Sequence, residues 1–246
     1  MLLIGCGSAA RRIAENIPTN HRVITVDEEG AKVIIPREIM MRDSEAYPYL
    51  PSSLDIYVKD RILVFGYLGG SYGHAGIKLL GKIAQHKKVE SFGYFVLPFP
   101  NEGHRFAEAV KFAEMLPKYY KAYTLIDSKI FLEKYRHIPF TRIPEIHAKN
   151  IFKIVKILNS EKAEKIKGRF YFGFGYSEGL DARNVSFHQA INAHWFKRCH
   201  NMLVLFRGDV DVREAEYIMR GFGEKYSIIV EKLPTRGCEV IAISWE

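Results

Sequence analysis

Short apolar runs alternate with amphipathic segments through the first half of the chain. The runs at 61–65 (RILVF) and 91–97 (SFGYFVL) have the length and composition of buried strands. The segments 75–86 and 103–119 place apolar residues three and four positions apart, as helices that pack on one face do. Strands that alternate with helices predict βαβ units joined by right-handed crossovers. We therefore expect an α/β fold with a mostly parallel, Rossmann-like sheet.

Two segments, residues 37–60 and 143–168, differ from this alternation of strands and helices. Residues 37–60 contain Pro48 and Pro51, and we interpret them as loop and irregular structure. Residues 143–168 carry apolar residues at helical spacing, which predicts one long helix that Gly168 ends. Four strand-like runs and two helix-like segments follow, as in a small α+β domain. The expected organisation is an N-terminal α/β domain at 1–142, a connecting helix at 143–167 and a C-terminal α+β domain at 168–246.

Composition narrows the class of protein. No apolar run in the 246 residues approaches the roughly 18 residues that a membrane span needs. The three cysteines lie far apart, so we expect reduced thiols in a cytoplasmic protein. Abundant Lys, Glu and Ile beside only two Gln are typical of a thermophile. His188, His194 and His200 recur at intervals that no single helix face brings together, so we expect no metal site.

The net charge has two interpretations. The formal charge of +8 fits solubility and the lysine-rich bias of a thermophile, which we favour, and it also fits attraction of nucleotides, nucleic acid or anionic lipid. Lys and Arg are spread along the chain without a long basic block. This spread does not favour a nucleic-acid partner, although the charge alone does not exclude one.

A glycine-bearing turn follows the first predicted strand. GCGSAA at 5–10 opens a helix, where backbone amides and the helix dipole favour a phosphate. Gly5, Gly7 and Ser8, with Asp27 at the end of the next strand, also fit a Rossmann dinucleotide site. In that site Asp27 would accept a hydrogen bond from a ribose hydroxyl. The alternative is a tight strand-to-helix turn in which both glycines serve packing.

Two more loops are expected at the same edge of the sheet, where ligands of open α/β sheets bind. VLPFPNEGHR at 96–105 brings Asn101, Glu102 and Arg105 to a helix start. Alternatively, Asn101 caps that helix and Glu102 occupies its first turn. The other loop can offer a polyphosphate several backbone amides and one hydroxyl, from Gly69, Gly70, Ser71 and Gly73.

The order of these loops resembles the FtsZ/tubulin superfamily. GGSYG at 69–73, LPFPNEG at 97–103 and LIDSK at 125–129 match the family's glycine-rich phosphate loop, L-P-F-x-x-E-G element and base-reading loop. The long helix is similar to the family's central helix. GRFYFGFGYSEG at 168–179 and LVLFRGDVDVREAE at 203–216 resemble its second half. The resemblance therefore covers most of the chain, in the family's order.

The resemblance implies a cytoplasmic protein that binds GTP or GDP and serves the cytoskeleton or cell division. Domain 1–142 would then bind the nucleotide. Glu102 and Arg105 would lie near the ribose, and Asp127 would lie near the base. Self-association, or association with an FtsZ homologue, is implied as well. The phosphates would be held by Ser8, Gly69, Gly70, Ser71 and Gly73.

Several residues depart from the family pattern at functional positions. Tyr72 and His74 stand where small residues are usual. The first loop has lost glycines, which Arg11 or Arg12 could partly replace by pairing with phosphate. NSEKAEKIKG at 159–168 lacks the acidic loop with which the family positions the attacking water. We therefore expect GTP hydrolysis to be absent or very weak and predict no catalytic residues.

Two other interpretations stay open. Tyr72 and the missing acidic loop also fit a nucleotide-free interaction or regulatory module of the same fold. GCGSAA with Asp27 also fits a Rossmann-type NAD-binding enzyme.

Overall fold

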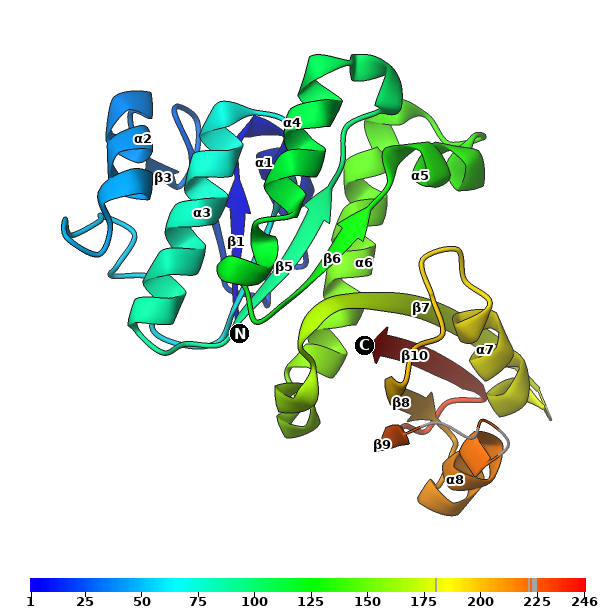
Figure 1. Cartoon of the computed structure of the whole chain (residues 1–246). Coiled ribbons are helices and arrows are strands. Elements are labelled where there is room, and N and C mark those ends of the chain that lie inside the picture. Colours follow the sequence, from blue (N-terminus) through cyan, green and yellow to red (C-terminus); the bar gives the residue numbers. More distant parts are fainter. Residues whose placement is uncertain (180, 221, 223–224) are drawn as a thin grey trace. The chain divides into compact units, whose positions relative to one another are not determined.

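The computed structural model describes residues 1–179, 181–220, 222 and 225–246. The chain forms two compact units, Met1–Phe152 and Lys153–Glu246. Strands β1 to β6 belong to the first unit, and β7 to β10 belong to the second (Figure 1). Within the described residues, no helix is both long enough and apolar enough to cross a membrane.

Six parallel strands form the sheet of the first unit, in the order β3-β2-β1-β4-β5-β6. The central strands β1 and β5 are buried along their whole length, which explains their uninterrupted apolar runs. The predicted α/β class with a mostly parallel sheet is confirmed. The strands are β1 (Leu2–Cys6), β2 (Val23–Asp27), β3 (Val33–Ile34), β4 (Ile62–Tyr67), β5 (Ser91–Val96) and β6 (Ala122–Ile126).

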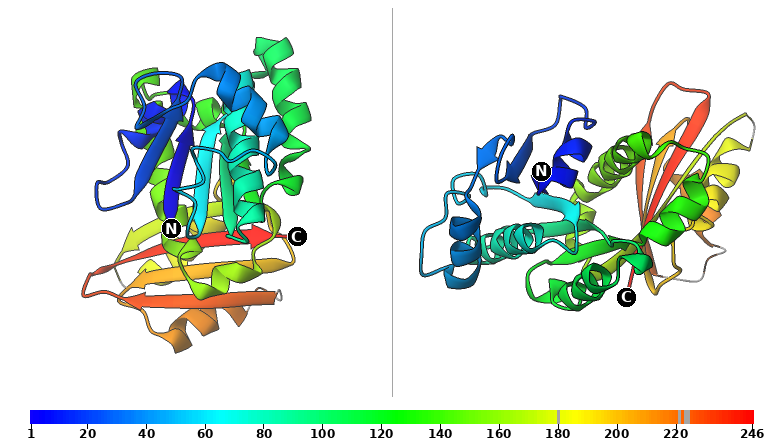
Figure 2. Two further views of the ribbon diagram at one scale, coloured as in Figure 1. Left: turned by 90° about the vertical axis from the view of Figure 1, so that its left-hand side faces the viewer. Right: turned by 90° about the horizontal axis from the view of Figure 1, so that it is seen from above.

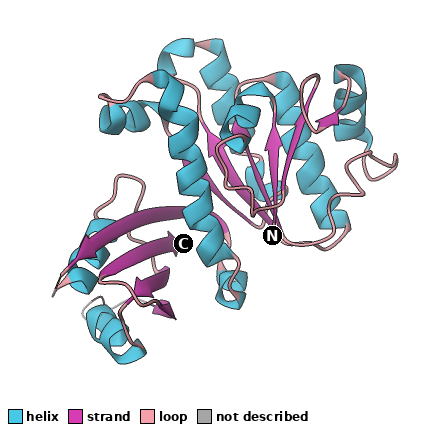
Figure 3. Ribbon diagram, turned by 180° about the vertical axis from the view of Figure 1, so that it is seen from behind, coloured by secondary structure: helices cyan, strands magenta, loops and turns pink. Residues whose placement is uncertain are grey.

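Helices cover both faces of this sheet. Helices α3 and α4 lie on one face, and α1 and the start of α6 lie on the other (Figures 1 and 3). Helix α3 packs most completely, with Ile77, Leu80 and Ile83 fully buried. The helices are α1 (Ser8–Ala14), α2 (Arg37–Ala46), α3 (Ser71–His86), α4 (His104–Ala113), α5 (Ser128–Tyr135) and α6 (Ile143–Leu158), with 3₁₀ turns η1 (Pro100–Glu102), η2 (Leu116–Lys118) and η3 (Phe140–Arg142).

Residues 37–60 are more regular than the sequence indicates. They contain α2, so the interpretation as loop was wrong for Arg37–Ala46. This helix buries only Met40, Asp43 and Ser44. Because two of these three residues are polar, the apolar periodicity by which a helix is recognised is missing.

The long helix α6 is shorter than predicted. It ends at Leu158 and not at Gly168. The amide of Asn159 still bonds to the carbonyl of Val155, but the amide of Ser160 bonds to Ile157, which tightens the chain into a 3₁₀ turn. A second 3₁₀ segment, η4 (Glu161–Lys165), follows. Gly168, with φ of 66°, starts the next strand instead of ending a helix.

The second unit has a mixed four-stranded sheet in the order β7-β10-β8-β9. Strand β10 is antiparallel to both neighbours, and β9 is parallel to β8. Two helices lie on one face (Figure 2), where Phe187, Phe206 and Met219 share one core. The elements are β7 (Gly168–Glu178), α7 (Ala182–Ile191), β8 (Asn201–Gly208), α8 (Val212–Arg220), β9 (Lys225–Lys232) and β10 (Gly237–Trp245).

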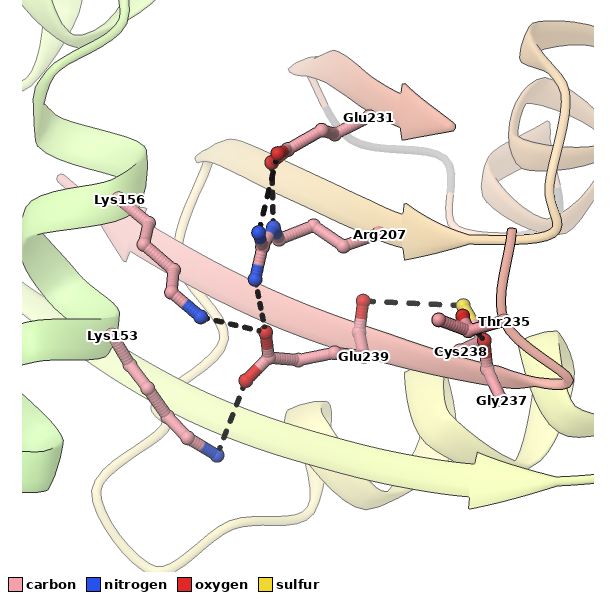
Figure 4. A network of polar contacts seen from close by, with 8 residues as sticks. All are labelled: Lys153, Lys156, Arg207, Glu231, Thr235, Gly237, Cys238 and Glu239. Atoms are coloured by element: carbon pink, nitrogen blue, oxygen red, sulfur yellow. Dashed lines mark hydrogen bonds and ion pairs between the residues drawn. The ribbon is translucent and has the colours of Figure 1, made fainter. Parts of the chain in front are cut away.

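An ion-pair network lies in the second unit (Figure 4). The carboxylate of Glu239 on β10 lies 3.0 Å from Nζ of Lys156, 3.5 Å from Nζ of Lys153 and 2.8 Å from Nη1 of Arg207. Arg207 also forms a bidentate pair with Glu231 on β9. Burial acts to raise the pKa of Glu239, but the hydrogen bonds from Lys156 and Arg207 hold it below its ordinary value. The network therefore ties the last turns of α6 to three strands.

Candidate functional site

Two neighbouring cavities lie in the first unit, at the edge of the sheet where β1 and β4 end. The first, which we call the glycine-loop cavity, has a volume of about 310 Å³. The second, the aromatic cavity, has a volume of about 470 Å³. Both are lined by Ser8, Ala9 and Tyr67, so they adjoin each other.

The glycine-loop cavity gathers residues from three loops that the sequence singles out. It is also lined by Cys6, Glu28 and Arg37, which the sequence does not indicate. The predicted residues that line it are Gly7, Ser8, Asp27, Gly70, Ser71, Tyr72, Gly73 and Arg105.

The start of helix α3 faces this cavity. The first amides of a helix have no intrahelical acceptor, and the N-cap of α3, Gly70, supplies no side-chain acceptor for them. A Cβ built at Gly70 would meet no atom within 4 Å, whereas one at Gly73 would lie 3.4 Å from the carbonyl oxygen of Tyr67. Helix α1 also starts here, from Gly7 with φ of 86°. Amides and the positive end of the α3 dipole can therefore bind an anion in this space.

Two arginines stand beside these amides. The guanidinium of Arg37 donates to Oγ of Ser71 and lies 3.3 Å from Oε1 of Glu28. Nε of Arg105 donates to the carbonyl of Gly69 at 3.3 Å, and its Nη1 donates to Oε2 of Glu102 at 2.7 Å. The sequence analysis missed Arg37 because its helix was interpreted as loop. The signal that could have found it is Pro36 directly before it, with Glu38 in a first helical turn.

His74 occupies one amide of the glycine loop. Its Nε2 accepts a hydrogen bond from the amide of Gly69 at 2.8 Å. The imidazole stacks on Phe112, with ring centroids 4.0 Å apart and planes 5° apart. Burial lowers the pKa of His74 to about 4, so the ring is neutral and can accept this bond at pH 7. The Gly69 amide is therefore engaged within the protein.

Gly69 itself has a backbone that few other residues adopt. Its φ is 94°, and an added Cβ would lie 2.7 Å from Cγ of Arg105. Glycine is therefore required here both by conformation and by space.

The hydroxyl of Tyr72 is engaged within the protein. The side chain is 7% exposed, and its Oη donates to the carbonyl of Ile35 at 3.0 Å. Burial raises its pKa above the ordinary value. The tyrosine therefore packs against the segment after β3, although part of it lines the glycine-loop cavity.

Gly5 lies inside β1, and Asp27 is the last residue of β2. A Cβ at Gly5 would meet the ring of Phe65 at 2.9 Å, and Gly5 lines neither cavity. Asp27 is 8% exposed, and its Oδ1 accepts from the amide of Glu28 at 2.9 Å.

The third loop is arranged differently from the expected helix cap. Asn101 lies exposed in η1, and α4 starts from Gly103 without a side-chain cap, so the expectation that Asn101 caps this helix was wrong. Oε1 of Glu102 accepts from the amide of Phe99 at 2.8 Å. Asn101 and Glu102 line neither cavity.

Asp127 serves as the cap of α5. Its Oδ1 accepts from the amide of Lys129 at 2.8 Å and from that of Ile130 at 3.4 Å. Asp127 also lines neither cavity, whereas its neighbour Ser128 lines the aromatic one.

The aromatic cavity is lined by rings and basic side chains. Arg11 lines it and donates from Nη1 to the carbonyl of Glu29 at 2.8 Å. Burial raises the pKa of Tyr67 to about 12, so this phenol is neutral at pH 7. The rings that line the cavity are Tyr67, Phe99, Phe131, Phe140 and His147.

His147 is fixed at the inner end of these rings. It is 1% exposed, and its Nδ1 lies 2.8 Å from Oη of Tyr94. Its ring stacks on Phe131, with centroids 4.4 Å apart and planes 22° apart. Burial lowers the pKa of His147 to about 3. A flat ligand can therefore contact aromatic surface here beside a neutral imidazole.

No cluster of three or more His, Cys, Asp or Glu side chains that could hold a metal is found among the residues the structure describes. His188, on α7, lies 6.0 Å from Phe187 between ring centroids. The arginines and helix-start amides of the glycine-loop cavity can bind an anion, and the rings of the aromatic cavity can stack on a flat ligand.

Comparisons with known proteins identify the fold. No family model matches the chain, and no curated protein matches its sequence. FtsZ of M. jannaschii (a W319Y mutant) superposes with a TM-score of 0.81 at 15% identity, over 100% of this chain and 90% of that one. GDP-bound CetZ1 of Haloferax volcanii gives 0.71 at 14%, over 98% and 92%. A GTPγS-bound protofilament of CetZ2 from the same organism gives 0.72 at 15%, over 98% and 91%.

The order of the loops resembles that of the FtsZ/tubulin superfamily, and these structural matches confirm the resemblance for the fold. The matches cover both units, but the sequence identities of 14–15% are too low to assign a function. The chain therefore has a fold of the FtsZ and CetZ type over its whole length.

Proposed function

We propose that this chain binds a guanine nucleotide, GTP or GDP, across the two adjoining cavities. The phosphates would lie in the glycine-loop cavity and the base in the aromatic cavity. The observation that carries the proposal is the uncapped start of α3 between two arginines, adjoining a cavity lined by aromatic rings. CetZ1 and CetZ2 of the same fold carry GDP and GTPγS in their solved structures, which supports the same ligand class here.

Arg37 would change partner on binding. In the structure it bridges Ser71 and Glu28. A phosphate beside the α3 amides offers this guanidinium a bidentate, doubly charged partner, which is stronger than an exposed carboxylate. Arg105, held by Glu102 and Gly69, would reach the same phosphates without rearrangement of its loop.

We further propose that hydrolysis is absent or very weak. The only acidic residues in segment 159–168 are Glu161 and Glu164, and both lie in the short 3₁₀ segment η4, among lysines. Both carboxylates are exposed and flanked by lysines, an arrangement that offers no evident means of positioning a water. The protein would then act by binding nucleotide and by assembly. Because solved relatives include an FtsZ dimer and a CetZ2 protofilament, we propose self-association or association with an FtsZ homologue.

Two observations favour a second candidate, a nucleotide-free interaction module. Arg37 already satisfies its guanidinium within the chain, through Ser71 and Glu28. His74 likewise occupies the Gly69 amide. If these contacts persist in solution, the glycine-loop cavity is closed to phosphate and the fold serves only partner binding.

Isothermal titration with GDP, GTP, ATP and NAD at about 0.15 M salt separates the candidates, since this salt screens non-specific attraction of polyanions to a basic protein. We expect saturable binding of GDP and GTP only. Tight binding of NAD would favour the Rossmann-enzyme interpretation, and binding of none of the four would favour the interaction module.

A pair of arginine variants tests the site itself. Arg37→Ala should weaken GDP binding by about tenfold or more, through loss of a charge-assisted contact. Arg22→Ala is the matched control, because Arg22 is exposed, pairs only at 3.7 Å with Asp60 and lines neither cavity. Equal affinities of the two variants would contradict the proposed phosphate position.

A further inference from the structure

Both carboxylate oxygens of Glu102 are engaged within the protein. Oε1 accepts a hydrogen bond from the amide of Phe99 at 2.8 Å, and Oε2 accepts one from Nη1 of Arg105 at 2.7 Å. Glu102 lines neither cavity, whereas Arg105 lines the glycine-loop cavity. The position of this carboxylate is therefore explained by its own loop and by Arg105.

Arg105 connects Glu102 to the glycine loop. Its Nε donates to the carbonyl of Gly69 at 3.3 Å. Its Cγ lies 2.7 Å from where a Cβ on residue 69 would stand, so the stem of the side chain packs directly on Gly69. The amide of Gly69 donates to His74 of α3. Both polar backbone groups of Gly69 are therefore held by side chains, one from α3 and one from α4.

The guanidinium of Arg105 keeps donors for a ligand. It has five N–H donors, and the two contacts above use one on Nε and one on Nη1. Because the group is planar, holding Nε and Nη1 also fixes the place of Nη2. The side chain is 53% exposed, and it lines the glycine-loop cavity. The remaining donors are therefore available to a phosphate in that cavity.

We infer that Glu102 is a positioning residue for the phosphates: it orients Arg105 through Oε2 and makes no contact of its own with the ribose. The inference rests on the nucleotide binding proposed above, and it departs from the role that the family resemblance implies for Glu102. The contribution of Glu102 to affinity passes through Arg105 and concerns the phosphate groups.

The direction of the effect separates positioning from charge. Glu102→Gln removes a negative charge beside an anion site and raises the formal charge of +8 by one unit, so charge alone predicts tighter binding of phosphate. Positioning predicts weaker binding. Glutamine has one acceptor oxygen in place of two, so it cannot serve the amide of Phe99 and the guanidinium of Arg105 together.

Isothermal titration with GDP at about 0.15 M salt compares Glu102→Gln with Glu108→Gln. Glu108 provides the matched control, because it is exposed on α4, lies 3.7 Å from His104 and lines neither cavity. We expect Glu102→Gln to weaken GDP binding by about threefold to tenfold, and Glu108→Gln to change it by less than about twofold. Unchanged or tighter binding by Glu102→Gln would overturn the inference.

Two further comparisons show whether the effect passes through Arg105 and leaves the ribose out. Arg105→Met keeps the apolar stem of the side chain and removes the guanidinium. Adding Glu102→Gln to this variant should weaken GDP binding no further, within about twofold. The factor lost in Glu102→Gln alone should be the same for GDP and for its analogue without ribose hydroxyls, dideoxy-GDP. A further loss in the Arg105→Met background, or a loss that disappears with the analogue, would contradict the inference.

A measurement on the unaltered protein keeps the inference testable should these variants not fold. Rotation about the Cζ–Nε bond is slow in a guanidinium that is held in place, and nitrogen-15 NMR then resolves Nη1 and Nη2 as separate signals. We expect two signals for Arg105 in the free protein. One averaged signal would show that Glu102 does not hold the guanidinium, and would overturn the inference while GDP binding stands. A wild type that binds no GDP would instead defeat the proposed function itself.

Discussion

Nε2 of His74 accepts a hydrogen bond from the amide of Gly69, five residues earlier and at the other end of the glycine loop. This contact holds the loop in a conformation in which residue 69 has a φ of 94°, a value that residues other than glycine rarely adopt. The imidazole also stacks on Phe112 of α4. The side chain of His74 therefore connects the glycine loop, helix α3 and helix α4.

Replacing His74 should destabilise the protein. His74→Ala removes the acceptor of the Gly69 amide and the stacking on Phe112, and we expect the free energy of unfolding to fall by about 2 kcal/mol. His104→Ala is the matched control, because His104 is exposed on α4 and lies 3.7 Å from Glu108 only. Urea denaturation followed by circular dichroism measures both. A His74→Ala protein as stable as the control would mean that the contact contributes nothing.

Acidification should destabilise the fold through the two buried histidines. The pKa of His74 is lowered to about 4 and that of His147 to about 3, both mainly by burial, against 6.5 for an ordinary histidine. Between these values the unfolded chain binds more protons than the folded one. Stability is therefore full above about pH 6.5 and is lost as the pH falls toward 4 and then 3.

Carboxylates also titrate in this pH range. The contribution of each histidine is therefore measured as the difference in unfolding free energy between the wild type and a variant that lacks that histidine. The free energy of unfolding of the wild type should fall more steeply between pH 7 and pH 4 than that of His74→Ala or His147→Phe. Parallel pH profiles for the wild type and both variants would show that neither imidazole is held neutral by the fold.

Filling the space at Gly70 should block phosphate binding without unfolding the protein. A Cβ there meets no atom within 4 Å, and the backbone, at φ −116° and ψ 131°, is extended and suits a branched residue. Gly70→Val should keep the free energy of unfolding within about 1 kcal/mol of wild type. Because the valine methyls would project into the glycine-loop cavity, GDP should bind at least about tenfold more weakly by titration.

The series Gly70→Ala and Gly70→Val provides the control for this prediction. The single methyl of alanine should weaken binding less than valine does. Undiminished GDP affinity in the valine variant would place the phosphates elsewhere.

The network around Glu239 should be sensitive to loss of its central charge. Glu239→Gln leaves Lys153, Lys156 and Arg207 around a neutral amide, and the side chain at this position is only 17% exposed. We expect a loss of about 3 kcal/mol in the free energy of unfolding. Glu231→Gln, at a side chain that is 47% exposed, should cost about 1 kcal/mol or less. Denaturant unfolding of both variants checks this, and equal losses would refute the central role of Glu239.

The sequence by itself determined the parallel sheet and the order of its loops. Buried strands such as β4 and β5 need continuous apolar runs, and their ends need glycine or proline turns, so local composition carries this information. The order of the glycine and proline loops was enough to indicate the fold family. It also indicated most residues that line the glycine-loop cavity, because loops that follow parallel strands meet at one edge.

Only the tertiary structure decided which side chains face those cavities. The helix that carries Arg37 lacks apolar periodicity, since its inner face is largely polar. The hydroxyl of Tyr72 bonds to the carbonyl of Ile35, and the buried ring of His147 bonds to Tyr94, 53 residues away in sequence. The carboxylate of Asp127 serves its own helix. Such contacts join residues distant in sequence, and no local pattern records them because they arise only when the elements pack.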